Sequence, residues 1–274
     1  MDPIAFKIGS LPIHWYGIFL ASGFLLGMWT ATLRGQRDGL DPEALSNLMV
    51  WVLLGALVGA KLLYVIDEWG GGQPLSSLLF QRAGLVFQGA LIGGVGAIYL
   101  YQRKHQLPLW RTLDAVAPSI ALGYCLGRLG CFMTGCCHGK ACAADHVHSL
   151  SGKFFSSGQI VWADSAPWLA LMYEAKGKLS NLPLYPTQLY ESLSGLVLYL
   201  GLSWLHRRKQ FDGQVFALYL MAYSLFRFLI EFFRGDRLVR VFNDQITQGQ
   251  IISVVMIIGG VWLWRRLART AAAS

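Results

Sequence analysis

Seven long apolar stretches separated by short polar segments constrain the fold of this chain more than any other feature. A helix needs about 20 predominantly apolar residues to cross the hydrocarbon core of a bilayer. The stretches lie near residues 13–33, 45–66, 84–101, 113–135, 187–205, 214–234 and 250–264. The sequence therefore predicts seven transmembrane helices. Because the third and seventh stretches are short, six helices are the alternative.

The composition argues against a water-soluble protein. Hydrophobic residues make up 54% of the 274 residues and charged residues only 14%, whereas soluble domains carry about 25% charged residues. The net charge of +8 would suggest nucleic-acid binding in a soluble protein. Here the charges form short clusters between apolar runs, which is typical of topology determinants. We therefore expect an all-α integral membrane protein with one polytopic domain over residues 1–274, embedded in the lipid bilayer and without a nucleic-acid partner.

Basic residues predict the orientation in the membrane. They cluster after the first, third, fifth and seventh stretches, at Arg34, Arg37, Arg103, Lys104, Arg111, Arg207, Arg208, Lys209, Arg265, Arg266 and Arg269. By the positive-inside rule, the N-terminus lies outside and the C-terminus in the cytoplasm. Residues 138–186 then form an extracytoplasmic loop or head region. No compact basic region precedes the first stretch, which we expect to be a permanent helix rather than a cleaved signal peptide.

Ionisable side chains lie in or at the edges of these stretches, where each costs about 2.5–3.5 kcal/mol at the helix centre. They are Lys61, Arg128, Glu191, Arg227 and Glu231. For Lys61, snorkelling or ion pairing between helices is an equally good explanation. The predicted topology brings polar residues from six helices to the outer side of the bilayer, namely His14, Tyr16, Lys61, Gln88, Arg128, Gln188, Glu191, Arg227 and Glu231.

Arg227 and Glu231 are four residues apart, so they share a helix face and can pair, and Arg234 continues that side one turn later. Guanidinium groups bind phosphate through a planar fork of donors, which predicts a site for a phosphate-bearing lipid. A transporter would place such a site near the midplane, so an outer-leaflet lipid enzyme is favoured. The glycines of the third stretch, at 89, 93, 94 and 96, are explained better by helix packing than by substrate approach.

Five cysteines lie between the fourth stretch and the start of the outer loop, at Cys125, Cys131, Cys136, Cys137 and Cys142. Their spacing matches neither a zinc C-x-x-C pair nor the C-x-x-C-H of haem attachment, so we predict no metal and no cofactor. An oxidising exterior favours one disulfide, between Cys142 and either Cys136 or Cys137. A membrane thiol or metal protein stays open as an alternative. Cys125 is expected to be a buried small hydrophobe.

The run GRLGCFMTGCCHG at residues 127–139 resembles the glycine–arginine motif of bacterial prolipoprotein diacylglyceryl transferases. Five further segments resemble motifs of that family in the same order: HWYG at 14–17, FQGALIGG at 87–94, YPTQLYE at 185–191, FRFLIEFFR at 226–234 and QGQI at 248–251. The resemblance extends from about residue 11 to residue 264. The ordered set is much more specific than any single motif.

The resemblance implies a multi-pass enzyme of the bacterial inner (cytoplasmic) membrane with its active site toward the outer leaflet. Such an enzyme transfers the diacylglyceryl group of phosphatidylglycerol to the lipobox cysteine next to a prolipoprotein signal peptide and releases glycerol 1-phosphate. On the matching positions, Arg128 and Arg227 would hold the phosphate, and Glu231 would orient Arg227. Tyr16 and Tyr223 would line the lipid site, with Gly139 in a nearby loop. The remaining candidates for substrate or lipid binding are His14, Gln188, Glu191 and Arg234.

Several positions depart from the family pattern. Gln88 stands where the family typically has a histidine that helps to activate the thiol, and glutamine cannot act as a general base. Cys131, Thr134 and Cys136 replace the usual Asn, Asn and Glu. His138, a neutral-thiol mechanism and deprotonation assisted by positive charge are the alternatives for the missing base. A non-catalytic lipid- or lipoprotein-binding protein on the same scaffold is the alternative function.

Overall fold

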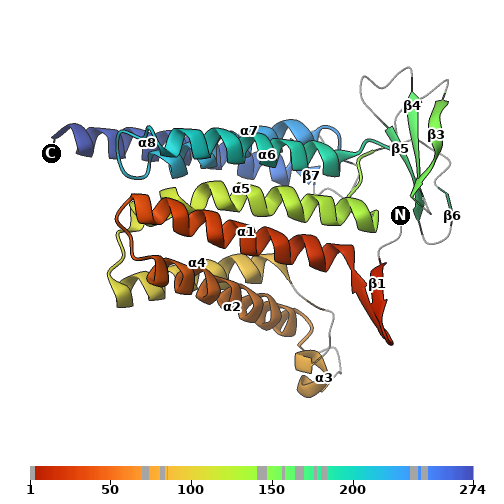
Figure 1. Cartoon of the computed structure of the whole chain (residues 1–274), viewed down its shortest axis with the longest axis horizontal. Coiled ribbons are helices and arrows are strands. Elements are labelled where there is room, and N and C mark those ends of the chain that lie inside the picture. Colours follow the sequence, from red (N-terminus) through yellow and green to blue (C-terminus); the bar gives the residue numbers. More distant parts are fainter. Residues whose placement is uncertain are drawn as a thin grey trace. The chain divides into compact units, whose positions relative to one another are not determined.

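Eight α-helices dominate the part of the chain that this computed structural model describes (Figure 1). The structure describes residues 4–69, 74–80, 84, 86–140, 147–155, 158–163, 170–175, 178–179, 184–234, 240–241 and 246–273. The helices are α1 (Trp15–Arg37), α2 (Pro42–Asp67), α3 (Leu75–Phe80), α4 (Phe87–His105), α5 (Leu109–Thr134), α6 (Thr187–His206), α7 (Gln214–Glu231) and α8 (Gln248–Ala273).

Five of the described helices, α1, α2, α5, α7 and α8, are long and apolar enough to cross a membrane. Helices α4 and α6 form at the third and fifth predicted stretches, with 19 and 20 residues. These two helices are not among the five that meet the criterion of length and hydropathy. The prediction of a helical, multi-pass membrane protein is thereby confirmed at this coarser level.

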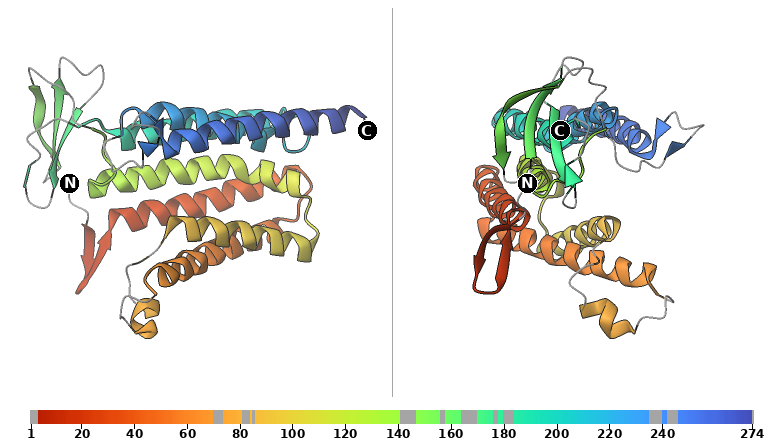
Figure 2. Two further views of the ribbon diagram at one scale, coloured as in Figure 1. Left: turned by 180° about the vertical axis from the view of Figure 1, so that it is seen from behind. Right: turned by 90° about the vertical axis from the view of Figure 1, so that its right-hand side faces the viewer.

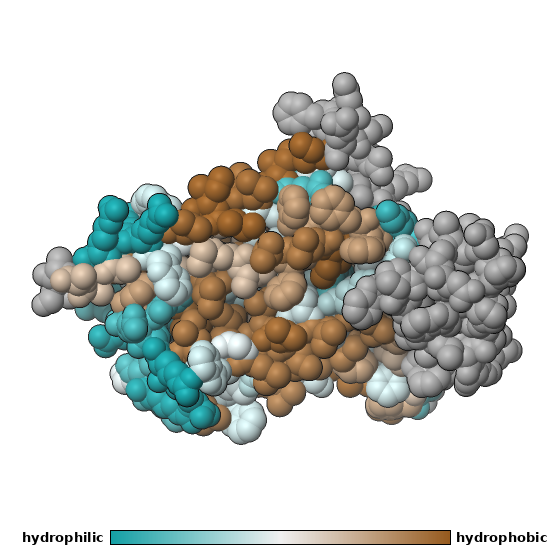
Figure 3. All heavy atoms as spheres, turned by 90° about the horizontal axis from the view of Figure 1, so that it is seen from above, coloured by the Kyte–Doolittle hydropathy of each residue, from teal (hydrophilic) through white to brown (hydrophobic). Residues whose placement is uncertain are grey.

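Apolar side chains cover much of the helix surface that would face lipid. Val255, Ile258 and Trp262 of α8 expose 62%, 63% and 58% of their surface, which a water-soluble helix would not tolerate over a whole face. In Figure 3, hydrophobic side chains fill the middle of the visible face, and hydrophilic ones gather toward the end that carries the C-terminus.

Short strands lie outside the helices, and the sequence patterns did not predict them. β1 (Ile4–Ile8) and β2 (Leu11–His14) form an antiparallel hairpin before α1. Between α5 and α6, an antiparallel sheet has the order β3 (Val147–Phe155), β4 (Gly158–Ala163), β5 (Ala170–Ala175) and β6 (Lys178–Leu179). β7 (Arg240–Val241) pairs with β8 (Ile246–Thr247) ahead of α8. The four-stranded sheet falls within the predicted head region at 138–186.

Several helix ends differ from the prediction; α4 and α5, for example, include residues that were expected in the loop between them, namely Arg103, Lys104 and Arg111. Arg34 was expected in a loop after the first helix, but α1 continues to Arg37, and Arg34 is buried with its Nε donating to the Ala115 carbonyl at 3.0 Å. Helix α8 continues to Ala273 rather than ending near residue 264. Arginines such as Arg265 and Arg266 end an apolar run, but they are good helix formers and do not end the helix.

The chain divides into two compact units, residues Met28–Ala115 and the combination of Met1–Gly27 with Val116–Ser274. In the Met28–Ala115 unit, α2 and α4 pack with their backbones in contact. A Cβ on Gly93 would collide with the carbonyl of Gly55, and one on Gly89 with the carbonyl of Gly59. This small-xxx-small packing supports the packing explanation for Gly89 and Gly93, whereas a Cβ on Gly96 would meet nothing within 4 Å.

In the other unit, α5, α6 and α7 share a core. Figure 2 shows the ribbons of the chain from two further directions. Its buried members are Ala117, Ala121, Leu198, Leu202, Val215 and Tyr219. A Cβ on Gly195 would approach the Ala121 carbonyl and the Cys125 nitrogen to 3.0 Å, so α5 and α6 are in close contact there. Arg128 and Glu191 each lie about one turn from this contact, on the same helix faces, which brings them together.

Candidate functional site

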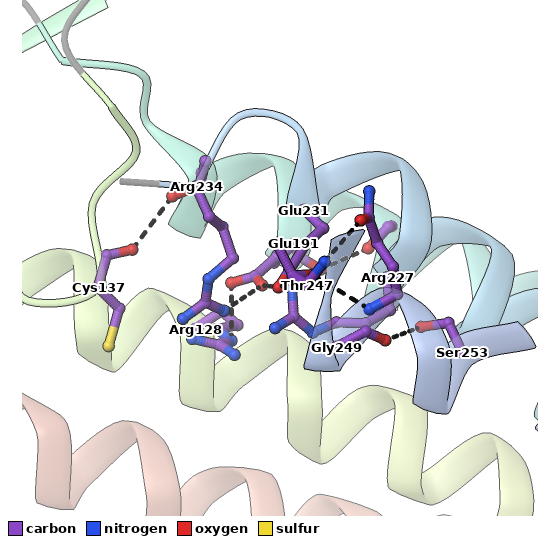
Figure 4. A network of polar contacts seen from close by, with 12 residues as sticks. Arg128, Cys137, Glu191, Arg227, Glu231, Arg234, Thr247, Gly249 and Ser253 are labelled. Atoms are coloured by element: carbon purple, nitrogen blue, oxygen red, sulfur yellow. Dashed lines mark hydrogen bonds and ion pairs between the residues drawn. The ribbon is translucent and has the colours of Figure 1, made fainter. Parts of the chain in front are cut away.

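Three arginines and two glutamates form one polar cluster in the unit that contains most of α5, together with α6, α7 and α8 (Figure 4). We call it the arginine cluster; its members are Arg128, Glu191, Arg227, Glu231 and Arg234. The sequence predicted all five as site residues. It placed Arg234 on the helix of Arg227, whereas α7 ends at Glu231 and Arg234 lies in the segment that follows.

Glu191 is the centre of the arginine cluster. Its side chain is fully buried, at 0% exposure, and all three arginines approach it. Arg128 Nε lies 2.9 Å from Oε2, and Arg234 Nη1 lies 3.2 Å from Oε1. Arg227 Nη1 is 3.9 Å from Oε1. A buried carboxylate is stable only when it is paired and hydrogen-bonded, and Glu191 meets that condition through three separate chain segments.

Glu231 is the second carboxylate, and it supports Arg227. The two side chains form an ion pair one helical turn apart, as their spacing predicted. Thr247 Oγ1 donates a hydrogen bond of 2.9 Å to Glu231 Oε1. A Cβ on Gly249 would lie only 2.6 Å from the same oxygen, so the start of α8 packs directly against the carboxylate.

The start of α8 is built to receive that carboxylate. Thr247 and Gln250 form a capping box: the Gln250 N–H donates to Thr247 Oγ1 at 3.2 Å, and the Thr247 N–H donates to Gln250 Oε1 at 3.0 Å. The N-terminal end of a helix also carries a partial positive charge, which favours a carboxylate nearby. Thr247 was not predicted as a site residue, although the pattern Thr-x-x-Gln ahead of an apolar run is a known signal for the start of a helix.

Exposure differs sharply between the two kinds of charge in the arginine cluster. Arg128, Arg227 and Arg234 keep 19%, 20% and 12% of their side-chain surface exposed, against 0% for Glu191 and 2% for Glu231. Three guanidinium groups and two carboxylates leave one positive charge in excess. The accessible part of the cluster is therefore cationic, and the buried carboxylates position the arginines from behind. This arrangement suits a phosphate group.

Gly139 joins three segments beside Arg234. It forms a β-bridge with Arg234, and its N–H donates to the Tyr185 carbonyl at 2.8 Å. A Cβ at this position would lie 2.6 Å from the Phe233 carbonyl oxygen and 2.6 Å from Tyr185 Cβ. Only glycine fits, so Gly139, which the sequence predicted near the site, holds together the segments that carry Arg234 and the start of α6.

The start of α6 also anchors the turn after α5. Gln188 is fully buried, and its Nε2 donates to the Cys136 carbonyl at 2.7 Å, while Thr187 Oγ1 donates to the Cys137 carbonyl at 3.1 Å. The predicted lipid-site residue Gln188 thus supports the backbone of this turn. In the turn, the His138 ring Nδ1 lies 3.1 Å from the Gly139 carbonyl oxygen.

Four cysteines lie in the described part of the chain, and all are free thiols. Cys125 is buried, as predicted, and lies 3.3 Å from Ser192 Oγ. Hydrogen bonds from Cys131, and then from Cys137 and Thr134, lower the pKa of Cys136 below that of an ordinary thiol. Cys142, the predicted disulfide partner, lies outside the described residues.

Aromatic residues adjoin the arginine cluster. The guanidinium of Arg128 lies over the Tyr124 ring at 5.2 Å, and Tyr124 meets Tyr223 edge-on at 5.3 Å. Tyr16 of α1 is 41% exposed and packs against α5, where a Cβ on Gly130 would lie 3.0 Å from its ring. Tyr16 and Tyr223 were both predicted to line a lipid site. Tyr16 lies on α1, which packs against the helix that carries Arg128, and Tyr223 lies on α7, which carries Arg227 and Glu231.

Three other polar residues were predicted to lie on the same side of the membrane as the arginine cluster. His14 is the exposed last residue of β2. Gln88 is exposed at the second position of α4, and the Lys61 amine lies 5.0 Å from the Tyr64 ring centre. Both Gln88 and Lys61 belong to the Met28–Ala115 unit. Their convergence with the arginines stays a prediction.

Comparison with known proteins shows that the chain is similar to members of one protein family along nearly its whole length. The family model for prolipoprotein diacylglyceryl transferase matches residues 3–266. The chain belongs to the prolipoprotein diacylglyceryl transferase family. The match includes α1 to α7, the part of α8 up to residue 266 and every residue of the arginine cluster, in agreement with the resemblance seen in the sequence motifs.

Relatives that carry the name phosphatidylglycerol–prolipoprotein diacylglyceryl transferase match the chain along nearly its whole length. The protein of Synechococcus elongatus is 33% identical, over 96% of this chain and 87% of its own. The protein of Clostridium tetani is 32% identical, over 96% of this chain and 97% of its own. The protein of Aliivibrio salmonicida is 34% identical, over 97% of this chain and 89% of its own. Members of this family from diverse bacteria are thus similar to the chain in both length and sequence.

Proposed function

We propose that this protein transfers the diacylglyceryl group of phosphatidylglycerol to the lipobox cysteine of a prolipoprotein. The observation that carries the proposal is the arginine cluster, which presents three guanidinium groups from a scaffold of buried carboxylates. Family membership supplies the reaction, and the relatives' names supply the two substrates. In this role Arg128 and Arg227 hold the lipid phosphate, Glu231 orients Arg227, and Glu191 holds all three arginines in place.

The reaction forms one bond and breaks one. The cysteine sulfur bonds to the glyceryl carbon, and the bond from that carbon to the phosphate oxygen breaks, so the electron pair leaves with glycerol 1-phosphate. The phosphodiester carries one negative charge, and the leaving phosphomonoester approaches two at neutral pH. Preplaced arginines stabilise this growing charge more in the transition state than in the substrate, which is what accelerates a reaction.

The substrate thiol must lose its proton to become a good nucleophile, since a free cysteine has a pKa of about 8.5. The excess positive charge of the arginine cluster favours the thiolate of a cysteine bound beside it. We propose that the electrostatic field of these arginines assists ionisation of the substrate thiol, whose proton passes to interfacial water. Gln88 contributes polarity to the site but no base catalysis.

Gln88→His tests the missing base directly. A histidine that reaches the thiol would add general-base catalysis, so we expect transfer at neutral pH to rise on the order of 10²-fold. The measurement is glycerol phosphate release by purified protein from pH 6 to about 9, around the thiol pKa. An unchanged rate and an unchanged pH profile would mean that position 88 does not face the thiol, which would contradict the proposed contribution of Gln88 to the site.

We further propose that α1, α2, α4, α5, α6, α7 and α8 all cross the inner membrane, with the N-terminus outside and the arginine cluster toward the outer leaflet. A periplasm-dependent reporter fused after the C-terminus is expected to be inactive. The same reporter inserted at Gly9, in the turn of the β1–β2 hairpin, is expected to be active. Activity of the C-terminal fusion would contradict the orientation.

Genetic complementation tests the proposed activity in the cell. The gene is expected to sustain growth of a bacterium depleted of its own diacylglyceryl transferase, and Arg128→Ala and Arg227→Ala are expected to abolish rescue at equal expression. Rescue by both variants would exclude the arginines from the reaction. If the intact protein inserts correctly but does not rescue, the alternative of a non-catalytic lipoprotein-binding protein is favoured, because Gln88 and the altered motif residues already distinguish this chain from the family pattern.

A further inference from the structure

Three cysteine sulfurs meet at the end of α5. The Sγ atoms of Cys131, Cys136 and Cys137 all lie within 4.8 Å of one another. The chain reverses here through Gly135 and Cys137, whose φ angles of +71° and +60° are left-handed. That conformation is uncommon for a residue other than glycine. The reversal, closed by the Cys136 N–H donating to the Cys131 carbonyl at 3.2 Å, folds two cysteines back over the third.

Neighbouring elements hold this arrangement in place. The carbonyl oxygens of Cys136 and Cys137 accept hydrogen bonds from Gln188 and Thr187, whose side chains are both fully buried at the start of α6. Thr134 Oγ1 lies 3.2 Å from Cys136 Sγ. Two of the three sulfur-bearing residues are therefore anchored through their own backbone, which is the kind of support that preorganises a ligand set.

We propose that Cys131, Cys136 and Cys137 bind one thiophilic d¹⁰ metal ion, such as Zn²⁺, Cd²⁺ or Cu⁺, through three thiolates. A zinc–sulfur bond is about 2.3 Å, which separates sulfurs around one ion by about 3.8–4.0 Å. Sulfurs that already lie within 4.8 Å of one another need only small side-chain rotations to reach that spacing. Soft thiolate ligands select soft ions over Mg²⁺ or Ca²⁺.

Access and charge agree with this ligand set. Cys136 is exposed, and Cys131 and Cys137 are half-buried, so an ion can enter from solvent. Binding a divalent ion would release up to three thiol protons and leave a net charge of −1 on the site. Arg128 lies one helical turn before Cys131 and provides a cation to offset it. This inference does not depend on the proposed transferase activity.

Cadmium binding to the purified full-length protein tests the proposal. With thiols kept reduced in detergent, titration with Cd²⁺ is expected to produce a sulfur-to-cadmium charge-transfer absorption that saturates at one ion per chain. Cys131→Ser and Cys137→Ser are each expected to weaken binding at least 10-fold, and the triple serine variant is expected to lose the band. Cys125→Ser is the matched control, because that buried thiol lies outside the cluster and its replacement should leave the titration unchanged.

Two results would overturn the proposal. The first is no charge-transfer band from wild-type protein whose thiols titrate as fully reduced. The second is a band that survives in the triple variant or that disappears only with Cys142→Ser, since the ligands would then lie elsewhere. Because the readout is absorption, failure of the transferase assay would not affect it. Thermal unfolding of each serine variant without metal distinguishes a lost ligand from a lost fold.

Discussion

Arg227→Ala is expected to lower the rate of diacylglyceryl transfer by about 10²- to 10³-fold, the usual cost of removing one preorganised donor to a developing oxyanion. Arg227 is paired with the buried Glu231, lies 3.9 Å from Glu191, and keeps 20% of its side chain exposed for an incoming phosphate. Arg227→Lys retains the charge but loses the planar fork of donors, so its rate should fall between that of the wild-type protein and that of Arg227→Ala. The measurement is glycerol phosphate release by purified protein at saturating phosphatidylglycerol.

Arg266→Ala is the matched control for this experiment. Arg266 lies far along α8 from its capped start, and its guanidinium lies over the Trp262 ring at 5.2 Å. Its removal should change the rate by no more than about twofold, in line with the small effects of exposed surface substitutions. An equal loss in Arg266→Ala and Arg227→Ala, or nearly full activity in Arg227→Ala, would show that Arg227 does not contact the reacting phosphate.

Glu191→Gln is expected to destabilise the folded protein by about 3–5 kcal/mol, as when one partner of a buried ion pair is removed. The substitution keeps the shape of the side chain but removes the negative charge that Arg128, Arg227 and Arg234 share. The three guanidinium groups would then repel one another around a neutral amide. The readout is the thermal unfolding midpoint in detergent, with transfer activity measured on the fraction that stays folded.

A second substitution distinguishes charge from packing. Adding Arg234→Gln to Glu191→Gln removes one of the uncompensated cations, so the double variant should be more stable than the sum of the single effects predicts. Glu43→Gln in the exposed first turn of α2 is the control and should leave the unfolding midpoint nearly unchanged. If Glu191→Gln unfolds at the wild-type temperature, Glu191 does not hold the arginines together.

The sequence predicted the helices better than it predicted the contacts between them. Apolar runs determined where helices form, because burial in lipid requires them, and the i, i+4 spacing predicted the Arg227–Glu231 pair. The central position of Glu191 was not predictable, because its partners lie on α5, on α7 and beyond the end of α7. Only the packing of those segments brings them to one carboxylate.

Other features were missed for different reasons. Thr247 was readable as the first residue of a capping box, but its contact with Glu231 depends on where α8 packs. Burial of Arg34 depends on the Ala115 carbonyl, 81 residues away in the chain. The cysteine spacing fits no metal template, yet a left-handed turn brings three sulfurs together. Spacing rules describe regular structure, and this turn is irregular.

The most direct test of the central claim is transfer by the purified protein itself. Folded protein in detergent is incubated with phosphatidylglycerol and a lipobox peptide, with glycerol phosphate release and peptide mass followed together. The account predicts glycerol phosphate and a diacylglyceryl-modified peptide in equal amounts. Both products should be absent when serine replaces the peptide's cysteine, and both should form about 10²- to 10³-fold more slowly when alanine replaces Arg227. Folded protein that yields neither product with any lipobox peptide would contradict the account.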